Sequence, residues 1–263
     1  DVAGQPFISR QLSYLKDQGF QNIVICTAHL GDKIKDYVGD GSQYNLNISY
    51  SDDGDQLLGT GGSAKKASKI LGENFFILYG DSFLPIDFSL IEKAFFEEKK
   101  PALMAVLKNF GQWDKSNAYF KNKCVSYNKQ NPKKDMDYID YGLSVVNNSI
   151  FDNFIENKNF DIAEIFENLS RNSLLAGYEV NERFYEIGST SGLNDTINEA
   201  APLNTDALIF GGEEDAFVLG VPELDGVYPN ATVLVSSTAD HHLPFSDDET
   251  YADVLAFFRE VID

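Results

Sequence analysis

The sequence is poor in cysteine and has no long apolar run. Its 263 residues include two cysteines, Cys26 and Cys124, which lack metal-ligand spacing and have no partner nearby in the sequence. We therefore expect buried, reduced thiols. No apolar stretch approaches the ~20 residues that span a bilayer, and the basic and apolar segments of a secretory signal are also absent. These absences predict a soluble protein of cytoplasmic origin.

Basic residues are scarce as well. The chain has 21 Lys and Arg against 41 Asp and Glu, which gives a formal net charge of −20. This balance opposes binding to a nucleic acid polymer or to an anionic membrane. Apolar residues make up 43 % of the chain and aromatic residues 13 %, so we expect a folded protein with a substantial core.

Lysine disappears from the chain near residue 200. Residues 201–263 contain no Lys, one Arg and thirteen Asp or Glu, whereas residues 1–198 are rich in Asn, Lys, Phe and Ile. The Ala200-Ala201-Pro202 junction follows a run with Asn and Thr, as at the end of an element or in a short linker. We therefore predict two domains, residues 1–199 and 200–263.

Strand and helix patterns alternate along the first domain. Continuous apolar runs predict strands buried on both faces at 23–26 and 75–79, and residues 46–50 alternate like a strand. Helical patterns cover residues 6–19, 32–38, 64–71 and 88–97. This order predicts a three-layer α/β/α fold with a mainly parallel sheet, whose ligands bind beyond the carboxyl ends of the strands.

Asp81 directly follows the second of these apolar strands, in the sequence Gly80-Asp81-Ser82. A carboxylate at such a strand end can reach the ligand crevice and is a hard oxygen ligand suited to Mg²⁺ beside a phosphate. Gly-Asp-Ser is also a common turn sequence. Taken alone, the motif favours the turn.

A glycine-rich segment, Leu58-Gly59-Thr60-Gly61-Gly62-Ser63, opens the helix that carries Lys65 and Lys66. Three glycines at a helix start let backbone N–H groups come close to a planar base or an anion. Glycine turns without a ligand are frequent, and the Walker spacing is absent.

Together these motifs resemble the sugar-1-phosphate nucleotidyltransferases, over residues 2–198. Val2–Phe7 is similar to the start of the helix after that family's nucleotide loop, with Gln5 in place of its Lys. Two further segments resemble the family's base-contacting glycine loop and its metal-binding strand end, namely Leu58–Ser63 and Gly80–Ser82. The resemblance implies a nucleotide-diphospho-sugar transferase-like fold.

Two later segments carry the resemblance to the sugar-phosphate side. Tyr127–Lys129 and Tyr138–Leu143 are similar to the branch that includes heptose-1-phosphate guanylyltransferases. Phe184–Ser189 resembles the segment with the second metal carboxylate, with Glu186 in place of the family's Asp.

The resemblance implies transfer of a nucleotidyl group from a nucleoside triphosphate to a sugar-1-phosphate, with release of pyrophosphate. It assigns Mg²⁺ to Asp81 and Glu186, and the sugar phosphate to Lys129 as a point charge. It also implies that Asp140 and the Gly142 backbone bind the sugar hydroxyls. Base and sugar contacts are expected from Leu58, Gly59, Thr60, Gly61 and Gly62. A solvated loop lysine beside Lys133 and Lys134 is an equally good interpretation of Lys129.

The family has a first strand, followed by a glycine-rich loop whose Arg grips the triphosphate, ahead of the segment that resembles Val2–Phe7. The sequence here begins after these parts. Their loss removes a central ladder and the main triphosphate site, so we expect weak or no transfer activity.

Residues 203–263 resemble the C-terminal end of α/β-hydrolases. Strands expected at 207–210 and 231–235 lead to Asp215 and His241, at the places of the triad acid and histidine, and an amphipathic helix is expected at 247–262. No G-x-S-x-G elbow supplies a nucleophile. A plain loop histidine is therefore the preferred interpretation of His241.

Three alternatives stay open for the chain: a transferase, an esterase-like hydrolase, and a non-catalytic chimera of the two. One further hypothesis is that residues 207–210, with Gly211-Gly212 after them, fill the place of the missing first strand.

Overall fold

The computed structural model describes residues 2, 4–54, 56–113 and 115–200, together with two strands nearer the C-terminus. The chain divides into two compact units, residues 1–196 and 197–263.

The first unit alternates helices and strands along most of its length. Its helices are α1 (Phe7–Asp17), α2 (Gly31–Val38), α3 (Gly59–Ala67), α4 (Phe88–Glu98), α5 (Ile162–Arg171) and α6 (Thr190–Ala200), with short 3₁₀ turns η1 (Ser42–Tyr44) and η2 (Asn148–Phe151). Its strands are β1 (Asn22–Thr27), β2 (Asn47–Asp52), β3 (Asn74–Leu78), β4 (Ser82–Phe83), β5 (Ala102–Lys108), β6 (Ala118–Lys121), β7 (Cys124–Tyr127), β8 (Tyr138–Asn147), β9 (Leu175–Val180) and β10 (Tyr185–Glu186).

A six-stranded sheet in the order β3-β8-β5-β9-β7-β6 forms the centre of this unit. Of its neighbouring strands, β5 and β9 pair in parallel, and the other pairs are antiparallel. The expectation of a mainly parallel sheet is therefore wrong for these pairings. Among the residues described between β5 and β8 there is no helix, so the chain returns through a hairpin and loops, and β8 runs against both of its neighbours.

The strands β1 and β2 form a separate, parallel two-stranded sheet. The expectation that residues 23–26 and 75–79 are buried on both faces is wrong: Ile23, Val24 and Ile25 are half-buried, and within β3 only Phe75 is buried. Among the described residues, β1 and β3 are edge strands of their sheets. Each is therefore less covered than a central strand. Cys26 and Cys124 are likewise exposed rather than buried.

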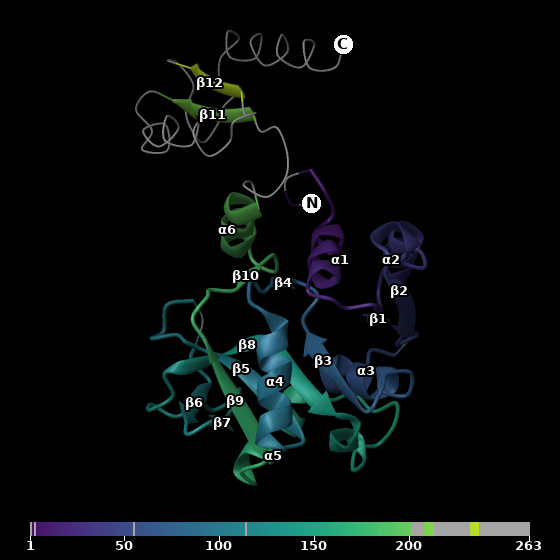
Figure 1. Ribbon diagram of the computed structural model, residues 1–263, viewed down its shortest axis with the longest axis vertical. Coiled ribbons are helices and arrows are strands. Elements are labelled where there is room, and N and C mark those ends of the chain that lie inside the picture. Colours follow the sequence, from purple (N-terminus) through teal and green to yellow (C-terminus); the bar gives the residue numbers. More distant parts are fainter. Residues whose placement is uncertain are drawn as a thin grey trace. The chain divides into compact units, whose positions relative to one another are not determined.

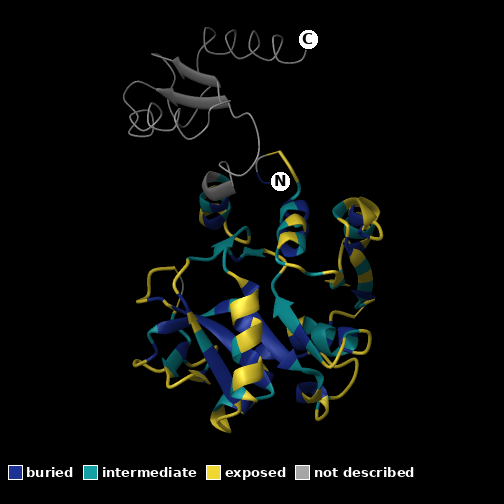
Figure 2. Cartoon of the chain, in the orientation of Figure 1, coloured by how far each residue is buried: buried dark blue, intermediate teal, exposed yellow. Residues whose placement is uncertain are grey.

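The core lies on both faces of the six-stranded sheet, as a three-layer arrangement requires. Along β5 the side chains alternate: Met104 and Val106 join the cluster under α5, whereas Leu103 and Leu107 join the cluster under α4. In Figure 1, α4 crosses the front of the sheet, and Figure 2 shows its outward face exposed and the strands behind it buried. The three-layer α/β/α expectation is confirmed for this unit.

The helix expected at residues 64–71 begins earlier than the sequence suggests. Gly59 to Gly62 form the first turn of α3 rather than a loop before it. Backbone hydrogen bonds explain this start, because the N–H groups of Gly61 and Gly62 both donate to the carbonyl oxygen of Phe160, at 2.9 and 3.4 Å. That carbonyl acts as the cap of the helix.

In the second unit, β11 (Leu208–Gly212) and β12 (Thr232–Ser236) pair in parallel. They confirm the strands expected near 207–210 and 231–235. Asp215, His241 and the helix expected at 247–262 lie outside the described residues. Filling of the missing strand position by residues 207–210 stays a prediction.

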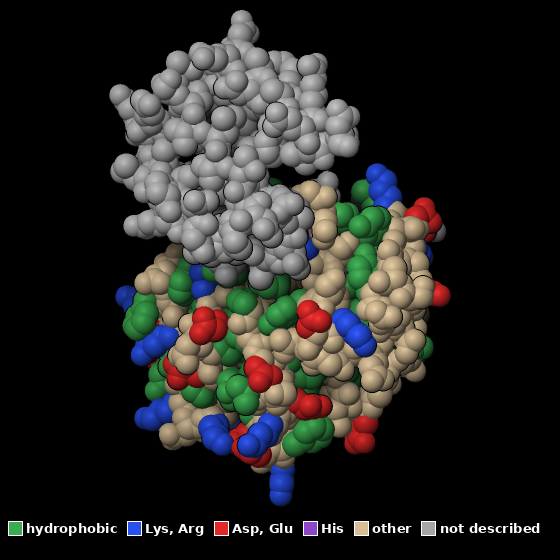
Figure 3. Space-filling view, turned by 45° about the horizontal axis from the view of Figure 1, so that its top comes forward, with side chains coloured by type: hydrophobic (Ala, Val, Ile, Leu, Met, Phe, Trp, Pro, Cys, Tyr) green, Lys and Arg blue, Asp and Glu red, His purple; other side chains and the backbone are tan. Residues whose placement is uncertain are grey.

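The face of the first unit seen in Figure 3 has acidic and basic side chains interspersed, without a continuous basic area. Within the described part of the chain, no helix is both long and apolar enough to cross a membrane.

Candidate functional site

A cleft of about 750 Å³ opens at one end of the six-stranded sheet. Its walls come from the turn after β3, from β8, and from the region of β10 and α6. Four carboxylates and two cations line it, namely Asp81, Asp140, Glu186, Asp195, Lys129 and Arg183. The structure thus brings Asp81, Lys129, Asp140, Gly142 and Glu186, expected as site residues, into one cleft.

A short antiparallel ladder places Asp81 and Glu186 side by side. Glu186 of β10 pairs with Ser82 of β4, and the Ile187 N–H donates to the Asp81 carbonyl oxygen at 3.0 Å. A Cβ atom on Gly188 would lie 3.1 Å from Asp81 Oδ2 and 3.2 Å from Glu186 Oε2. Both carboxylates therefore face the same small space. This space is open because glycine at position 188 has no side chain.

The Glu186 carboxylate also holds the start of α6. The Ser189 N–H donates to Oε2 at 2.9 Å, and the Ser189 hydroxyl donates to Oε1 at 2.5 Å. A negative side chain is favourable at a helix N-terminus. The helix thereby orients Glu186 toward the space that it shares with Asp81.

The two adjacent carboxylates suit a magnesium ion, whereas a metal site built from protein ligands alone would need more donors. Mg²⁺ keeps several waters and is usually held by one or two carboxylates plus substrate phosphates. In the residues that the structure describes, no group of three or more His, Cys, Asp or Glu side chains could hold a metal. The donor set of Asp81 and Glu186 therefore suits an ion that is completed by substrate.

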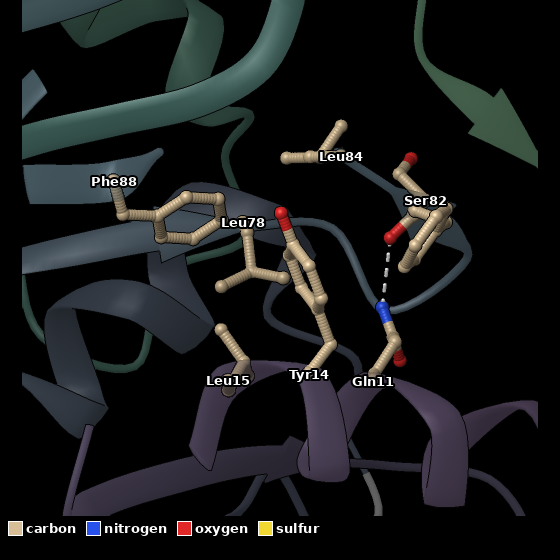
Figure 4. Close-up of a pocket in the computed structure, with 8 residues that line it drawn as sticks. Gln11, Tyr14, Leu15, Leu78, Ser82, Leu84 and Phe88 are labelled. Atoms are coloured by element: carbon tan, nitrogen blue, oxygen red, sulfur yellow. Dashed lines mark hydrogen bonds between the residues drawn. The ribbon is translucent and has the colours of Figure 1, made fainter. Parts of the chain in front are cut away.

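Gln11 of α1 fixes the turn that carries Asp81 (Figure 4). Its side-chain Nε2 donates to the Ser82 carbonyl oxygen at 2.9 Å and to the Tyr79 carbonyl oxygen at 3.3 Å. The Gln11 side chain is buried against the apolar residues around Tyr14. Because the two carbonyl groups flank Gly80 and Asp81, one buried amide anchors both sides of the turn.

Asp140 lies on β8 and turns its carboxylate back onto its own strand. Its Oδ1 accepts a hydrogen bond from the Gly142 N–H at 3.0 Å, and Gly142 has a φ of +86°. Burial raises the pKa of the Asp140 carboxyl to about 6, and the negative charge of Asp161 adds to the rise; the Gly142 N–H and the Lys129 ammonium oppose it. Asp140 is therefore sensitive to the charges around it.

Lys129 has two hydrogen-bonding partners at α5. Its Nζ lies 2.6 Å from Asp161 Oδ2, and its backbone N–H donates to Glu167 Oε1 at 3.1 Å. These contacts attach Lys129 to α5 and to the residue before it. The Lys129 side chain is nevertheless 49 % exposed, so its role in holding a sugar phosphate stays a prediction beside the alternative of a solvated lysine.

The glycine-rich turn is not part of the cleft lining. A Cβ on Gly61 would lie 2.2 Å from the Phe160 ring, and one on Gly62 would lie 2.5 Å from the Lys158 carbonyl oxygen. Close packing therefore accounts for these two glycines, and their N–H groups are already engaged. Contact of Leu58, Gly59, Thr60, Gly61 and Gly62 with a base or sugar stays a prediction.

Sequence reasoning missed Gln11, Asp161 and Arg183. The Arg183 guanidinium lies over the Tyr185 ring, 4.9 Å from its centroid, and pairs with Asp195 at 2.5 Å. Asp161 precedes an amphipathic helix, so its cap role could have been found from sequence. No sequence signal marks the partners of Gln11, which is 68 residues from Tyr79.

Comparison with known proteins gives concordant matches. Residues 1–201 match the protein family described as Nucleotidyl transferase. The chain is 44 % identical over 90 residues to N-acetylmuramate alpha-1-phosphate uridylyltransferase of Neisseria meningitidis serogroup B, a match that covers 34 % of this chain and 39 % of the relative. It is 25 % identical over 166 residues to D-glycero-alpha-D-manno-heptose 1-phosphate guanylyltransferase of Campylobacter jejuni, which covers 63 % of this chain and 73 % of the relative.

The fold is similar to that of a solved structure, HddC from Yersinia pseudotuberculosis complexed with GMP-PN. The TM-score is 0.65, at 19 % sequence identity, over 76 % of this chain and 87 % of the other. The likeness supports the nucleotide-diphospho-sugar transferase-like α/β fold expected from the sequence.

Proposed function

Since residues 1–201 match its family description, the chain belongs to the Nucleotidyl transferase family, and from that premise we propose that its cleft transfers a nucleotidyl group from a nucleoside triphosphate to a sugar-1-phosphate. In this reaction an oxygen of the sugar phosphate attacks the α-phosphorus, the bond to the β-phosphate breaks, and pyrophosphate leaves. The observation that carries the proposal is the joint presence of Asp81, Glu186 and Lys129 in one cleft.

Asp81 and Glu186 are the residues that would hold Mg²⁺. When bound, the ion neutralises charge on the phosphate oxygens and orients them for in-line displacement. The protein contributes the orientation of both carboxylates, through the β4–β10 ladder and the Gln11 anchor.

Lys129, Asp140 and Gly142 form the sugar-phosphate side of the proposed site. The Lys129 ammonium holds the phosphate as a point charge. The Asp140 carboxylate and the Gly142 backbone hold sugar hydroxyls, because carboxylate and carbonyl oxygens accept hydrogen bonds. Positioning of this kind converts a bimolecular step into one within a complex.

The names of the relatives describe uridylyl and guanylyl transfer, so UTP and GTP are the first nucleotides to test. A cytoplasmic location and a weak rate stay predictions from the sequence. An esterase-like activity is not favoured, because the sequence has no nucleophile elbow and Asp215 and His241 lie outside the described residues.

Calorimetric titration of GTP, UTP, CTP and dTTP, each with Mg²⁺, tests the proposal. We expect one nucleotide to bind to the native chain and to lose its Mg²⁺-dependent binding in Asp81→Asn. Circular dichroism confirms that both proteins are folded. A folded chain that binds none of the four would contradict a working transferase site.

A further inference from the structure

The Asp161 carboxylate joins three parts of the chain. Its Oδ1 accepts hydrogen bonds from the Ala163 N–H at 2.9 Å and from the Thr60 hydroxyl at 3.0 Å. Its Oδ2 accepts one from Lys129 Nζ at 2.6 Å. One carboxylate therefore caps α5, contacts the glycine-rich turn and holds the lysine that lines the cleft.

The Thr60 hydroxyl fixes the carboxylate in one orientation. It accepts a hydrogen bond from the Ile162 N–H at 3.0 Å, so its single hydrogen is left to donate to Asp161. Next to it, the Gly61 N–H donates to the Phe160 carbonyl oxygen. The first turn of α3 and residues 160–162 thus form one hydrogen-bonded unit, which sets the position of Asp161 Oδ2.

Lys129 gains its direction from this unit. A free lysine side chain samples many rotamers, and an anion that binds it must overcome the loss of this rotamer entropy. An ammonium group has three donors. With one donor given to Asp161, two others stay available for a phosphate in the cleft, so the ion pair and phosphate binding are compatible.

We propose that Asp161 is a positioning residue, which orients Lys129 toward the phosphate of the substrate and, through Thr60, couples the glycine-rich turn to the sugar-phosphate end of the cleft. The role of Lys129 toward a substrate phosphate rests on the proposed function, whereas the orientation of Lys129 by Asp161 does not.

Two variants separate the ion pair from the helix cap. Asp161→Asn keeps an oxygen that can cap α5 and accept from Thr60, but it loses the charge that holds Lys129. Thr60→Val removes the hydroxyl at nearly constant shape, and Thr60→Ser restores it. The coupling predicts that Thr60→Val and Thr60→Ser differ in how firmly Lys129 is held, although Thr60 does not line the cleft.

The first measurement needs no ligand. In protein labelled with ¹⁵N at lysine Nζ, we expect a protected Lys129 ammonium signal, assigned by its absence in Lys129→Arg. The signal should disappear in Asp161→Asn, weaken in Thr60→Val and return in Thr60→Ser. An unchanged signal in Asp161→Asn and Thr60→Val would overturn the proposal.

The second measurement titrates inorganic phosphate into each protein. We expect roughly fivefold weaker binding in Asp161→Asn and a smaller loss in Thr60→Val, because an unrestrained Lys129 must be ordered by the anion. Tighter binding in Asp161→Asn would identify Asp161 as a competitor of phosphate and would overturn the positioning role. If native protein binds no phosphate while the lysine signals change as expected, the positioning of Lys129 stands and its proposed role in the transferase fails.

Asp87→Asn is the matched control. Asp87 caps α4 as Asp161 caps α5, accepting from the Ser89 N–H at 2.9 Å and from the Ser89 hydroxyl at 2.6 Å, and it does not line the cleft. Its variant should change stability about as much as Asp161→Asn while leaving the Lys129 signal and phosphate binding unaltered. A loss of the Lys129 signal in Asp87→Asn would assign the effect to capping in general and overturn the proposal.

Discussion

Glu186 stands opposite Ser82 in the antiparallel ladder between β10 and β4. This pairing brings Glu186 next to Asp81, although more than a hundred residues separate the two carboxylates in the sequence. The ladder is only two residues long, so the arrangement depends on the groups that support it. Gln11 supports one side and Gly188 leaves room on the other.

Gln11→Leu should destabilise the turn that carries Asp81. The change removes the Gln11 donor from the carbonyl groups of Tyr79 and Ser82, although the Tyr79 carbonyl keeps a hydrogen bond from the Ser82 N–H at 3.3 Å. A buried polar group that loses its partner costs about 1–3 kcal/mol. Urea unfolding measures the free energy, and Mg²⁺ titration should show weaker binding. Gln43→Leu is the control, because Gln43 bonds the carbonyls of Tyr37 and Val38 in an exposed region. Equal Mg²⁺ affinity in both variants would contradict the role of Gln11.

Gly188→Ala should impair the carboxylate pair while the fold persists. The new methyl group would stand 3.1 Å from Asp81 Oδ2 and 3.2 Å from Glu186 Oε2 and push the carboxylates from their shared space. Changes beside metal ligands typically lower affinity about 10-fold or more, so Mg²⁺-dependent nucleotide binding should fall by about that factor. Gly72→Ala, whose methyl group would have its nearest neighbour at 4.0 Å, should have no such effect. The idea fails if the two variants bind alike.

Gly61→Ala should destabilise the protein, although alanine normally favours a helix by about 1 kcal/mol over glycine. The added carbon would lie 2.2 Å from the Phe160 ring and 2.9 Å from the Ile162 nitrogen. Overpacking of this kind costs about 1–3 kcal/mol, to be measured by urea unfolding. Phe160→Leu should be partly compensating in a double-mutant cycle. A more stable Gly61→Ala protein would contradict the packing explanation.

Asp140 should titrate with a pKa of about 6 in the folded protein. This value lies above the unfolded value of about 3.9, so the stability contributed by Asp140 is full below pH ~4 and is lost as the pH rises through the folded pKa. ¹³C NMR of the aspartate carboxyl groups, assigned with Asp140→Asn, measures it. Lys129→Met should raise the pKa further, because the Lys129 charge lowers it. A resonance that titrates near 4 would show the prediction to be wrong.

Much of the site was accessible to sequence reasoning because it consists of local motifs. Asp81 follows its strand, and Gly142 lies two residues from Asp140 on one strand. Such neighbours are fixed by the chain itself. The sheet directions could not be obtained in this way, since β8 reaches its place through a hairpin and loops that carry no helical pattern.

The glycine-rich segment has packing partners that its sequence does not reveal. Its glycines predicted a ligand-binding turn, which stays a prediction; the structure shows that Gly61 and Gly62 pack on Phe160 and Lys158, about a hundred residues away. Composition cannot distinguish a glycine that makes room for a ligand from one that makes room for another part of the chain.

The sequence by itself determined the alternation of elements, the break in composition near residue 200 and the residue types available for phosphate chemistry, because propensity, periodicity and charge are properties of short segments. Only the tertiary structure decided which of these groups meet. Asp81 meets Glu186, Asp161 meets Lys129, and Gln11 anchors the turn that carries Asp81. Side-chain hydrogen bonds and close packing decide these contacts, because they act over ångströms of space rather than along the chain.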